Sequence, residues 1–328
     1  MTTEDVSTAH ERTLRPVDRP TVSAVVVSYW TGPSLRQSLP SILAEPQIQE
    51  LIVVNNGNDR EAVEYLDTLG RSDSRVSVLH PESNVGFSAG CNLGVSRCHG
   101  DFVALINPDL IVAPGTIRAV VEALNLHANA WVAGIRLVNA DGTAQRGDRR
   151  EILTPWRALV ELIRLDRLFA GHPYFRRFHS FEVGTLEGTV EVPTVSGAFM
   201  VMARATYQRL GGFDDNMFMH VEDSDLCLRV HKLGGKAIYC SDVACMHYRS
   251  TSDSPRAFVE WHKTRSSSYY FHKHFFDSYP QWTLTLISAA LWMRFWVRAI
   301  PMVIKDVPGL IRHWRRRYPG PGSRDRAL

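Results

Sequence analysis

The sequence predicts an α/β fold in which a mostly parallel sheet is flanked by helices, with an α-helical extension at the C-terminus. Three observations carry this prediction. Short runs rich in β-branched residues alternate with helical patterns from Thr21 to about Tyr248. The runs are almost entirely apolar, as expected for strands that helices cover on both faces. Each run is separated from the next by enough residues for a helix, which is the order that produces a parallel sheet.

Length and composition agree with a globular chain. The protein has 328 residues, of which 45% are hydrophobic and 22% charged, which excludes collagen-like, coiled-coil and disordered chains. Single cores stop growing at about 250–300 residues, so one large domain with an appendage is expected. We predict a disordered lead over residues 1–20, without a secretory signal, a main domain over 21–250 and a helical region over 251–328.

The expected elements follow in order along the chain. Four apolar runs predict the first strands, at residues 22–28, 50–54, 75–79 and 101–106. Beyond Trp131 the pattern is mixed, with a turn at 139–142 and an arginine-rich loop at 146–150. A helix near 155–169 precedes two short strands around Ser196 and Gly197. A further helix and two closing strands are predicted at 222–233, 236–239 and 243–247.

Polar and glycine-rich segments follow each of the first four strands. In a parallel sheet, ligands bind outside the carboxyl ends of the strands, so these segments are the candidate site. The residues concerned are Ser28 and Tyr29, Asn55 to Asp59, Asn84 to Gly94, and Asn107 to Asp109. Three glycines at a spacing of four do not match the dinucleotide fingerprint G-x-G-x-x-G, which disfavours a dehydrogenase.

Two acidic motifs provide candidate chemistry. Asp109 follows an apolar strand, where a carboxylate can hold a divalent cation against a diphosphate; Asn-Pro-Asp is also an ordinary turn sequence. Glu222, Asp223 and Asp225 fall within four residues at the start of a predicted helix. They can stabilise the helix through its dipole, or their crowding can raise a proton affinity and create a general base.

Taken together, the motifs resemble those of the family 2 inverting glycosyltransferases and occur in the same order along the chain. This family has the GT-A fold, a Rossmann-like fold of nucleotide-diphospho-sugar transferases. Within the family, the chain is similar to the branch of bacterial rhamnosyltransferases that act on lipid-linked glycans. The motifs span Val22 to Arg249 and are Val25–Tyr29, Val53–Asn56, Asn84-x-Gly86-Phe87, Gly90-x-Asn92-x-Gly94, Asn107–Asp109, Ser196–Ala198, Gly211–Asp214, Glu222–Arg229 and His247.

This resemblance implies a role for each matching residue in binding a dTDP- or UDP-sugar donor. Ser28 and Tyr29 are expected against the base, with Asn55 and Asn56 below it. Many relatives have Asp in place of Asn55, whose amide oxygen can still accept the N3–H of uracil or thymine. The other residues expected to line the nucleotide pocket are Asn84, Gly86, Asn92 and Asn107.

The resemblance also implies a metal site and a base. Asp109 and His247 are expected to bind Mn²⁺ or Mg²⁺ with the donor diphosphate; a polar contact at a strand end is the other interpretation of His247. Asp223 is the expected base for the acceptor hydroxyl, and one direct displacement inverts the anomeric carbon. The residues expected to shape the acceptor side or to position the helix are Ser196, Gly197, Glu222 and Asp225.

The C-terminal region combines aromatic residues with positive charge. From Trp282 onward, nine arginine and lysine residues face two aspartates, a net charge of +7, whereas the whole chain carries +3. The twelve uncharged residues 282–293 are too few to span a bilayer, which needs about 20. We predict a helix that lies in an anionic membrane surface, on the inner face of the plasma membrane. A helical hairpin packed on the main domain is the alternative.

Other functions fit less well. Five cysteines, without a CxxC pair, predict no disulfide framework and a cytosolic setting, and Cys240, Cys245 and His247 lack a second pair for zinc. No G-x-S-x-G motif surrounds Ser196, which disfavours a serine nucleophile. Nucleic acid is an unlikely partner, although the basic run 312–317 attracts polyanions. The competing class is a catalytically silent sugar-nucleotide-binding scaffold of a glycan-assembly complex.

Overall fold

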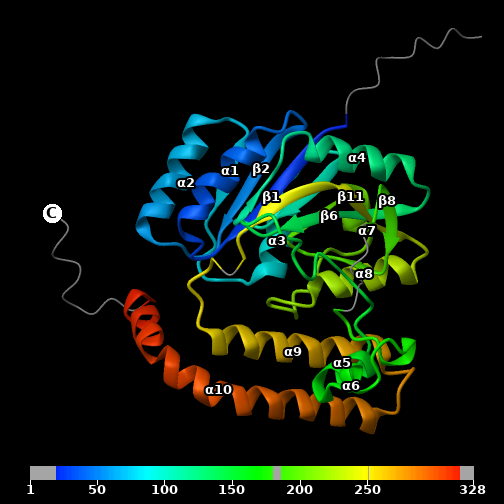
Figure 1. The fold of residues 1–328 in the computed structure, drawn as a ribbon. Coiled ribbons are helices and arrows are strands. Elements are labelled where there is room, and N and C mark those ends of the chain that lie inside the picture. Colours follow the sequence, from blue (N-terminus) through cyan, green and yellow to red (C-terminus); the bar gives the residue numbers. More distant parts are fainter. Residues whose placement is uncertain (1–19, 180–185, 250, 318–328) are drawn as a thin grey trace, which may run out of the picture.

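A mixed sheet between two helical layers forms the main body of the protein, and a pair of long C-terminal helices lies beneath it (Figure 1). The computed structural model describes residues 20–179, 186–249 and 251–317, and of 302–317 the backbone only. The predicted lead over residues 1–20 lies outside the described residues, except Pro20. In the described part, nine strands form one sheet and two form a separate pair.

The first half of the sheet has the predicted parallel arrangement. The four predicted runs form β1 (Val22–Ser28), β2 (Ile48–Asn55), β3 (Val76–Leu79) and β4 (Phe102–Ile106), in the order β3-β2-β1-β4. All three pairings among them are parallel. Every residue of β1 is buried, as its apolar sequence predicts for a strand covered on both faces.

The second half of the sheet mixes directions. The order continues β10-β6-β11-β5, with β8 paired to β11. Only the β6–β11 pairing is parallel there. The bounds are β5 Leu110–Ile111, β6 Ala130–Val138, β8 Thr189–Val192, β10 Phe199–Ala203 and β11 Lys236–His247. The two predicted closing strands are one strand, β11, whose register against β6 shifts between Cys240 and Ala244. The separate pair joins β7 (Arg149–Arg150) to β9 (Thr194–Val195).

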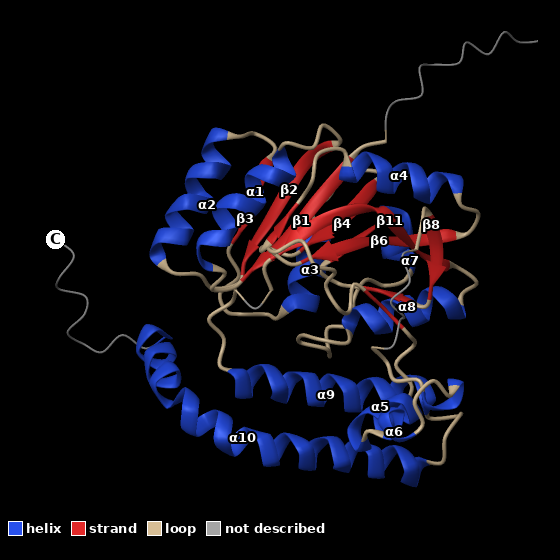
Figure 2. Ribbon diagram, viewed as in Figure 1, coloured by secondary structure: helices blue, strands red, loops and turns tan. Residues whose placement is uncertain are grey.

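Helices cover both faces of the sheet (Figure 2). One face packs on α1 (Leu35–Leu43), α2 (Arg60–Ser72) and α4 (Thr116–Leu126), and the other on α3 (Phe87–Val95), α7 (Arg204–Arg209) and α8 (Glu222–Lys232). Burial of these apolar faces is the main driving force for the fold. The predicted helix over 155–169 divides into α5 (Pro155–Ile163) and α6 (Leu165–Leu168), because Arg164 between them is left-handed.

The C-terminal helices form a packed hairpin. In α9 (Arg256–Phe275) and α10 (Gln281–Arg317), buried residues such as Tyr270, Phe271, Leu284 and Leu291 make a third apolar cluster with residues near α5. By length and composition, Gln281–Pro301 is the one helical stretch among the described residues that is long and apolar enough to cross a membrane, and 33% of its most apolar part is buried inside the protein. Hairpin packing, the alternative interpretation of the sequence, is therefore observed.

We predict that Gly94→Ala destabilises the fold by about 1–3 kcal/mol, the usual cost of overpacking. A Cβ at Gly94 in α3 would lie 2.3 Å from Val25 Cγ1 of β1. Gly70→Ala is the matched control, because a Cβ at this helical position has its nearest atom at 3.4 Å. The free energy of unfolding, measured in urea, should fall for Gly94→Ala only; an equal response of the two variants would contradict the close approach.

Candidate active site

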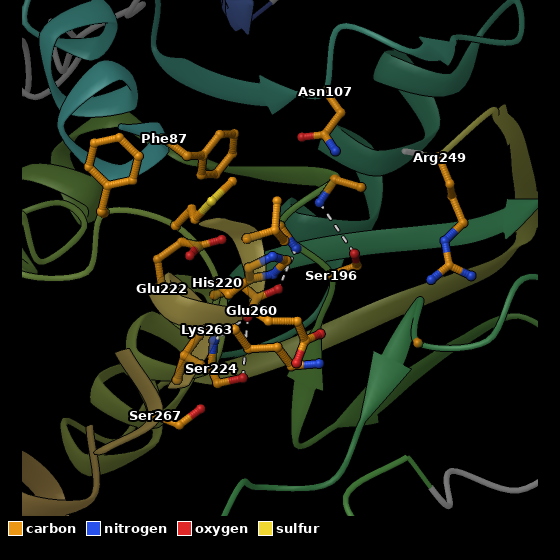
Figure 3. A pocket seen from close by; sticks show the side chains of 18 of the residues that line it. Phe87, Asn107, Ser196, His220, Glu222, Ser224, Arg249, Glu260, Lys263 and Ser267 are labelled. Atoms are coloured by element: carbon orange, nitrogen blue, oxygen red, sulfur yellow. Dashed lines mark hydrogen bonds between the residues drawn. The ribbon is translucent and has the colours of Figure 1, made fainter. Parts of the chain in front are cut away.

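A cavity of about 900 Å³ lies between the sheet and the C-terminal helices (Figure 3). Tyr29 lines it from the end of β1, Asn107 and Asp109 from the end of β4, and Asp223 from the start of α8. Lys263 of α9 also lines it, near His220 and Ser224 in Figure 3. The cavity thus lies at the carboxyl ends of parallel strands, where a fold of this type binds its ligands.

Asp109 and His247 meet on the cavity wall. The short strand β5 pairs with the end of β11, so that His247 lies opposite Leu110 and the Tyr248 N–H donates to the Asp109 carbonyl at 3.0 Å. His247 Nε2 is 3.1 Å from Asp109 Oδ1, and the Thr251 hydroxyl donates to Asp109 Oδ2 at 3.0 Å. Both side chains are buried. Burial opposes ionisation of Asp109, but the contacts with His247 and Thr251 together outweigh it and lower the pKa of the carboxyl.

This pair fits a divalent cation of the hard or borderline type. Two ligand atoms about 2.1 Å from a metal and at right angles to each other are about 3.0 Å apart, close to the observed 3.1 Å. Among the described residues, no group of three or more His, Cys, Asp or Glu side chains is arranged so that it could hold a metal ion. Two protein ligands leave the remaining positions for water and substrate phosphates, as Mg²⁺ and Mn²⁺ sites commonly do.

The start of α8 is held in a strained backbone conformation. His220 and Val221 both have positive φ, at 64° and 74°, which is costly for a β-branched residue such as Val221. The helix begins directly after them with Glu222 and Asp223, both buried and both lining the cavity. Such strain concentrates at functional sites, and here it places two adjacent carboxyl groups inside the protein.

Asp223 is surrounded by hydrogen-bond donors. Its Oδ2 accepts from the Gly197 N–H at 2.8 Å and from the Arg150 guanidinium, and its Oδ1 accepts from the Ser224 N–H at 2.7 Å. Burial raises the pKa of Asp223, but the Arg150 charge and these bonds outweigh burial and lower it. Asp223 is therefore ionised, and Gly197 contributes to its position.

Glu222 has the opposite environment. Its Oε2 is buried without a hydrogen-bond partner among the described residues. Burial, followed by the charge of Asp223, raises the pKa of Glu222 well above its ordinary value. The two adjacent carboxyl groups thus differ in proton affinity: Asp223 is ionised, and Glu222 binds a proton more tightly.

Asp225 does not line the cavity. It is fully buried, and its carboxylate contacts Arg229 of α8 at 2.7 Å and Lys273 and His274 of α9 at 2.6 and 2.7 Å. Burial opposes ionisation, but these partners, His274 first, lower the pKa of Asp225 to about 2. Of the two roles expected for Asp225, this position fits holding the helix and does not fit contact with an acceptor.

The cavity brings together most of the predicted site residues. Those lining it are Tyr29, Asn56, Asn84, Gly86, Asn107, Asp109, Ser196, Gly197, Glu222, Asp223 and His247. Gly86 is required by a close approach, since its φ is 89° and a Cβ there would lie 2.5 Å from the Phe218 carbonyl oxygen. Asn56 donates to the Gly86 carbonyl at 2.8 Å and so holds this loop.

Ser28 and Asn55 lie outside the lining and build the loop beneath it. Asn55 Oδ1 accepts from the Gly57 N–H, the Asn58 N–H and the Asn58 side chain, the last at 2.8 Å. The Ser28 hydroxyl contacts Thr31 and Asn58. Ser28 was expected against the base and Asn55 below it. Neither lines the cavity, and the Asn55 oxygen, expected to accept from the base, already has three donors within the loop.

Asn92 is also outside the cavity. Its Oδ1 accepts from the Tyr207 hydroxyl at 2.6 Å and from the Phe213 N–H, and its amide group donates to the Phe213 carbonyl and to Asp215. Asn92 therefore ties α3 to the Gly-Gly-Phe-Asp turn, and the predicted contact with the nucleotide does not fit this position.

Several lining residues were not predicted as site residues. Arg150, Gln145, Arg249 and Lys263 all face the cavity, and Figure 3 shows Arg249 and Lys263 on different sides of it. The only signal in the sequence was the arginine-rich run at 146–150. Arg150 of this run pairs with Asp223, which lies 73 positions further along the chain. The five cysteines are buried, and none of them is in a disulfide.

The fold is that of the GT-A-type transferases. Its cavity is lined by an acidic residue and a histidine at strand ends and by a buried carboxylate at the start of a helix. Residues 20–267 match the profile of the glycosyltransferase-like family 2, and the chain belongs to this family. Over 288 residues it is 24% identical to an N-acetylglucosaminyl-diphospho-decaprenol L-rhamnosyltransferase of Mycobacterium tuberculosis, covering 79% of this chain and 88% of that protein.

Further similarities are more distant. An O-antigen biosynthesis protein of Myxococcus xanthus is 24% identical over 72% of this chain and 18% of its own length. Among solved structures, a mannosyltransferase from Pyrobaculum calidifontis in complex with GDP-mannose and Mn²⁺ superimposes with a TM-score of 0.52 at 16% identity. The superposition covers 90% of this chain and 81% of the mannosyltransferase chain. The structural likeness confirms the predicted GT-A fold.

We predict that Glu222→Gln stabilises the protein at alkaline pH. A raised pKa in the folded state means that wild-type stability falls as the pH rises from about 4.3, where the unfolded Glu ionises. The glutamine variant lacks this loss, so its advantage in free energy of unfolding should grow with pH and exceed about 1 kcal/mol at pH 8.5. A pKa difference of one unit between the folded and unfolded states already corresponds to about 1.4 kcal/mol. Urea unfolding from pH 4.5 to 8.5 measures it, with exposed Glu122→Gln as control; parallel curves would contradict the raised pKa.

Proposed function

We propose that the protein is an inverting, metal-dependent glycosyltransferase that moves a sugar from a nucleotide-diphosphate donor to a hydroxyl of a glycan or lipid-linked saccharide. The proposal fits cell-surface polysaccharide synthesis. One observation carries it: Asp109, His247 and Asp223 line the same cavity although they come from three distant segments of the chain. Family membership supports the class of reaction, and the cavity supports the assignment of residues.

In this proposal, Asp109 and His247 hold Mn²⁺ or Mg²⁺, which stabilises the charge that develops on the departing nucleoside diphosphate. Asp223 accepts the proton of the acceptor hydroxyl as its oxygen attacks the anomeric carbon. The acceptor must take the place of one of the donors now bonded to Asp223. Gly197 and Arg150 meanwhile hold the carboxylate in position.

The donor assignment rests on relatives and on the nucleotide side of the cavity. Tyr29, Asn56, Asn84, Gly86 and Asn107 are proposed to bind the nucleotide. We propose dTDP-L-rhamnose as the donor because the M. tuberculosis relative is a rhamnosyltransferase; UDP-sugars are the alternative. A catalytically silent sugar-nucleotide-binding scaffold is disfavoured, because such a protein has no need of a buried, ionised carboxylate in the cavity that Asp109 and His247 also line.

The acceptor side of the cavity extends to the C-terminal helices. Its wall includes Leu291 and Arg294 of α10. The opposite face of α10 carries an exposed apolar stripe with members three or four residues apart, made of Trp282, Leu286, Ala289, Met293, Trp296, Val297 and Ile300. The predicted basic run at 312–317 continues this helix, although its side chains lie outside the described residues. We propose that the stripe rests on the anionic inner face of the plasma membrane, from which a lipid-linked acceptor enters.

We predict that Asp223→Asn lowers turnover at least about 100-fold, the lower end of general-base contributions, and that Asp109→Ala abolishes the stimulation by Mn²⁺ or Mg²⁺. The assay incubates the protein with dTDP-rhamnose or UDP-sugars and a lipid-linked acceptor, and measures release of nucleoside diphosphate. Inversion is read from the anomeric configuration of the product by NMR.

Asp277→Asn, at an exposed position between α9 and α10, is the matched control and should retain wild-type turnover. Intact turnover in both Asp223→Asn and Asp109→Ala would contradict the assigned roles. Donor binding without any transfer, across the sugar and acceptor panel, would instead favour the scaffold.

We predict that replacing Leu286, Met293 and Val297 together by serine lowers binding to vesicles that contain phosphatidylglycerol at least tenfold, because burial of one such side chain contributes about 1.5–3 kcal/mol. Co-sedimentation measures the binding, with neutral phosphatidylcholine vesicles and the exposed Leu126→Ser of α4 as controls. Equal binding of the triple variant and the wild type would show that this stripe does not contact lipid.

A further inference from the structure

His247 Nδ1, the ring nitrogen that does not contact Asp109, is hydrogen-bonded to Gln145, a buried residue of the loop after β6. We infer that Gln145 is a positioning residue: it fixes the His247 imidazole so that the Nε2 lone pair points toward Asp109, ready to bind a divalent cation. This inference rests on the metal site of the proposed function and concerns how this chain prepares that site.

The orientation of the Gln145 amide follows from its own partners. Its Nε2 donates to the Asn139 Oδ1 at 3.0 Å and to the backbone carbonyl of His247 at 3.1 Å. Both partners are acceptors, so the NH₂ group must face them and Oε1 must face the ring. Gln145 Oε1 is 2.7 Å from His247 Nδ1. A carbonyl oxygen at this distance requires a proton on Nδ1.

The proton on Nδ1 decides what Nε2 can do. In the neutral imidazole only one ring nitrogen carries hydrogen, so Nε2 presents its lone pair. It lies 3.1 Å from Asp109 Oδ1, and the Asn107 amide nitrogen, a possible donor to it, is 3.4 Å away. In the imidazolium form a proton on Nε2 faces Asp109 instead, which is the contact that lowers the pKa of Asp109. A divalent cation would take the place of this proton and bind both atoms. Ligating histidines commonly owe their orientation to such a bond at the other nitrogen.

The backbone holds Gln145 rigidly in this place. Its N–H donates to the Leu137 carbonyl at 2.8 Å, and an isolated bridge pairs Val138 with Ala144. The turn between them is closed by the Asn139 N–H, which donates to the Thr143 carbonyl at 2.9 Å. The Asn-Ala-Asp-Gly turn, which the sequence marks only as a turn, therefore carries both Gln145 and the Asn139 side chain that orients it.

The experiment measures Mn²⁺ binding directly, without turnover. Free Mn²⁺ is followed by electron paramagnetic resonance during titration of the full chain in saturating dTDP, with UDP in parallel. Gln145→Leu removes the acceptor and should weaken Mn²⁺ binding about 10- to 100-fold, the usual effect of losing such a partner. Gln145→Glu keeps an acceptor oxygen for Nδ1 but loses the donors to Asn139 and to the His247 carbonyl, so it should bind Mn²⁺ more tightly than Gln145→Leu and less tightly than the wild type. Gln208→Leu, exposed on α7, should change nothing.

A double variant separates positioning from general damage. In a His247→Ala background, Gln145→Leu should cause no further loss of Mn²⁺ affinity, and dTDP binding without metal should be unchanged throughout. If Gln145→Leu does not fold, Asn139→Ala tests the same chain of bonds and should weaken Mn²⁺ binding in the same direction.

The outcomes are distinct. Wild-type affinity in Gln145→Leu, or an equal loss in the His247→Ala background, overturns the role of Gln145 and leaves the proposed function standing. Absence of Mn²⁺ and Mg²⁺ binding by the wild-type protein with either nucleotide overturns the metal site itself, and this inference with it.

Discussion

The candidate site depends on one short antiparallel pairing, between β5 and the last residues of β11. Asp109 and His247 are 138 residues apart in the chain, and only two register positions, at Leu110 and Ile111, join the strands that carry them. Side chains alternate between the faces of a strand, so a slip of one residue would turn His247 away from Asp109. The cores on both faces of the sheet hold this register and so hold the site.

Environment, more than residue type, distinguishes the carboxyl groups at the start of α8. Asp223 receives the Arg150 charge and two backbone N–H groups, whereas one oxygen of Glu222 is buried without a partner. Adjacent groups of the same chemistry therefore differ in proton affinity, as pairs of acids and bases in enzymes commonly do. The left-handed backbone at His220 and Val221 forces both groups inward at once.

The sequence was informative where the pattern is local. The four parallel strands, α8 and the residues after β4 followed from apolar runs and from motifs. The central strand β6 was missed because its run, Ala130–Val138, includes Gly134 and Arg136. Asn55 and Asn92 were assigned to the nucleotide, yet their side-chain amides form hydrogen bonds within the protein. Asn55 bonds Asn58 in its own loop, and Asn92 bonds Phe213 and Asp215 in a distant turn. Arg150 and Gln145 could not be predicted, since their partners Asp223 and His247 lie far along the chain.

The buried contacts of Asp225 have a mechanical consequence. Lys273 and His274 clamp α9 to α8 through a carboxylate with no exposure to solvent, and breaking a buried pair by moving one partner is costly. α9 and the first turn of α8 must therefore move together. A displacement of α9 would shift Asp223, which lies in the same turn of α8, together with Asp225.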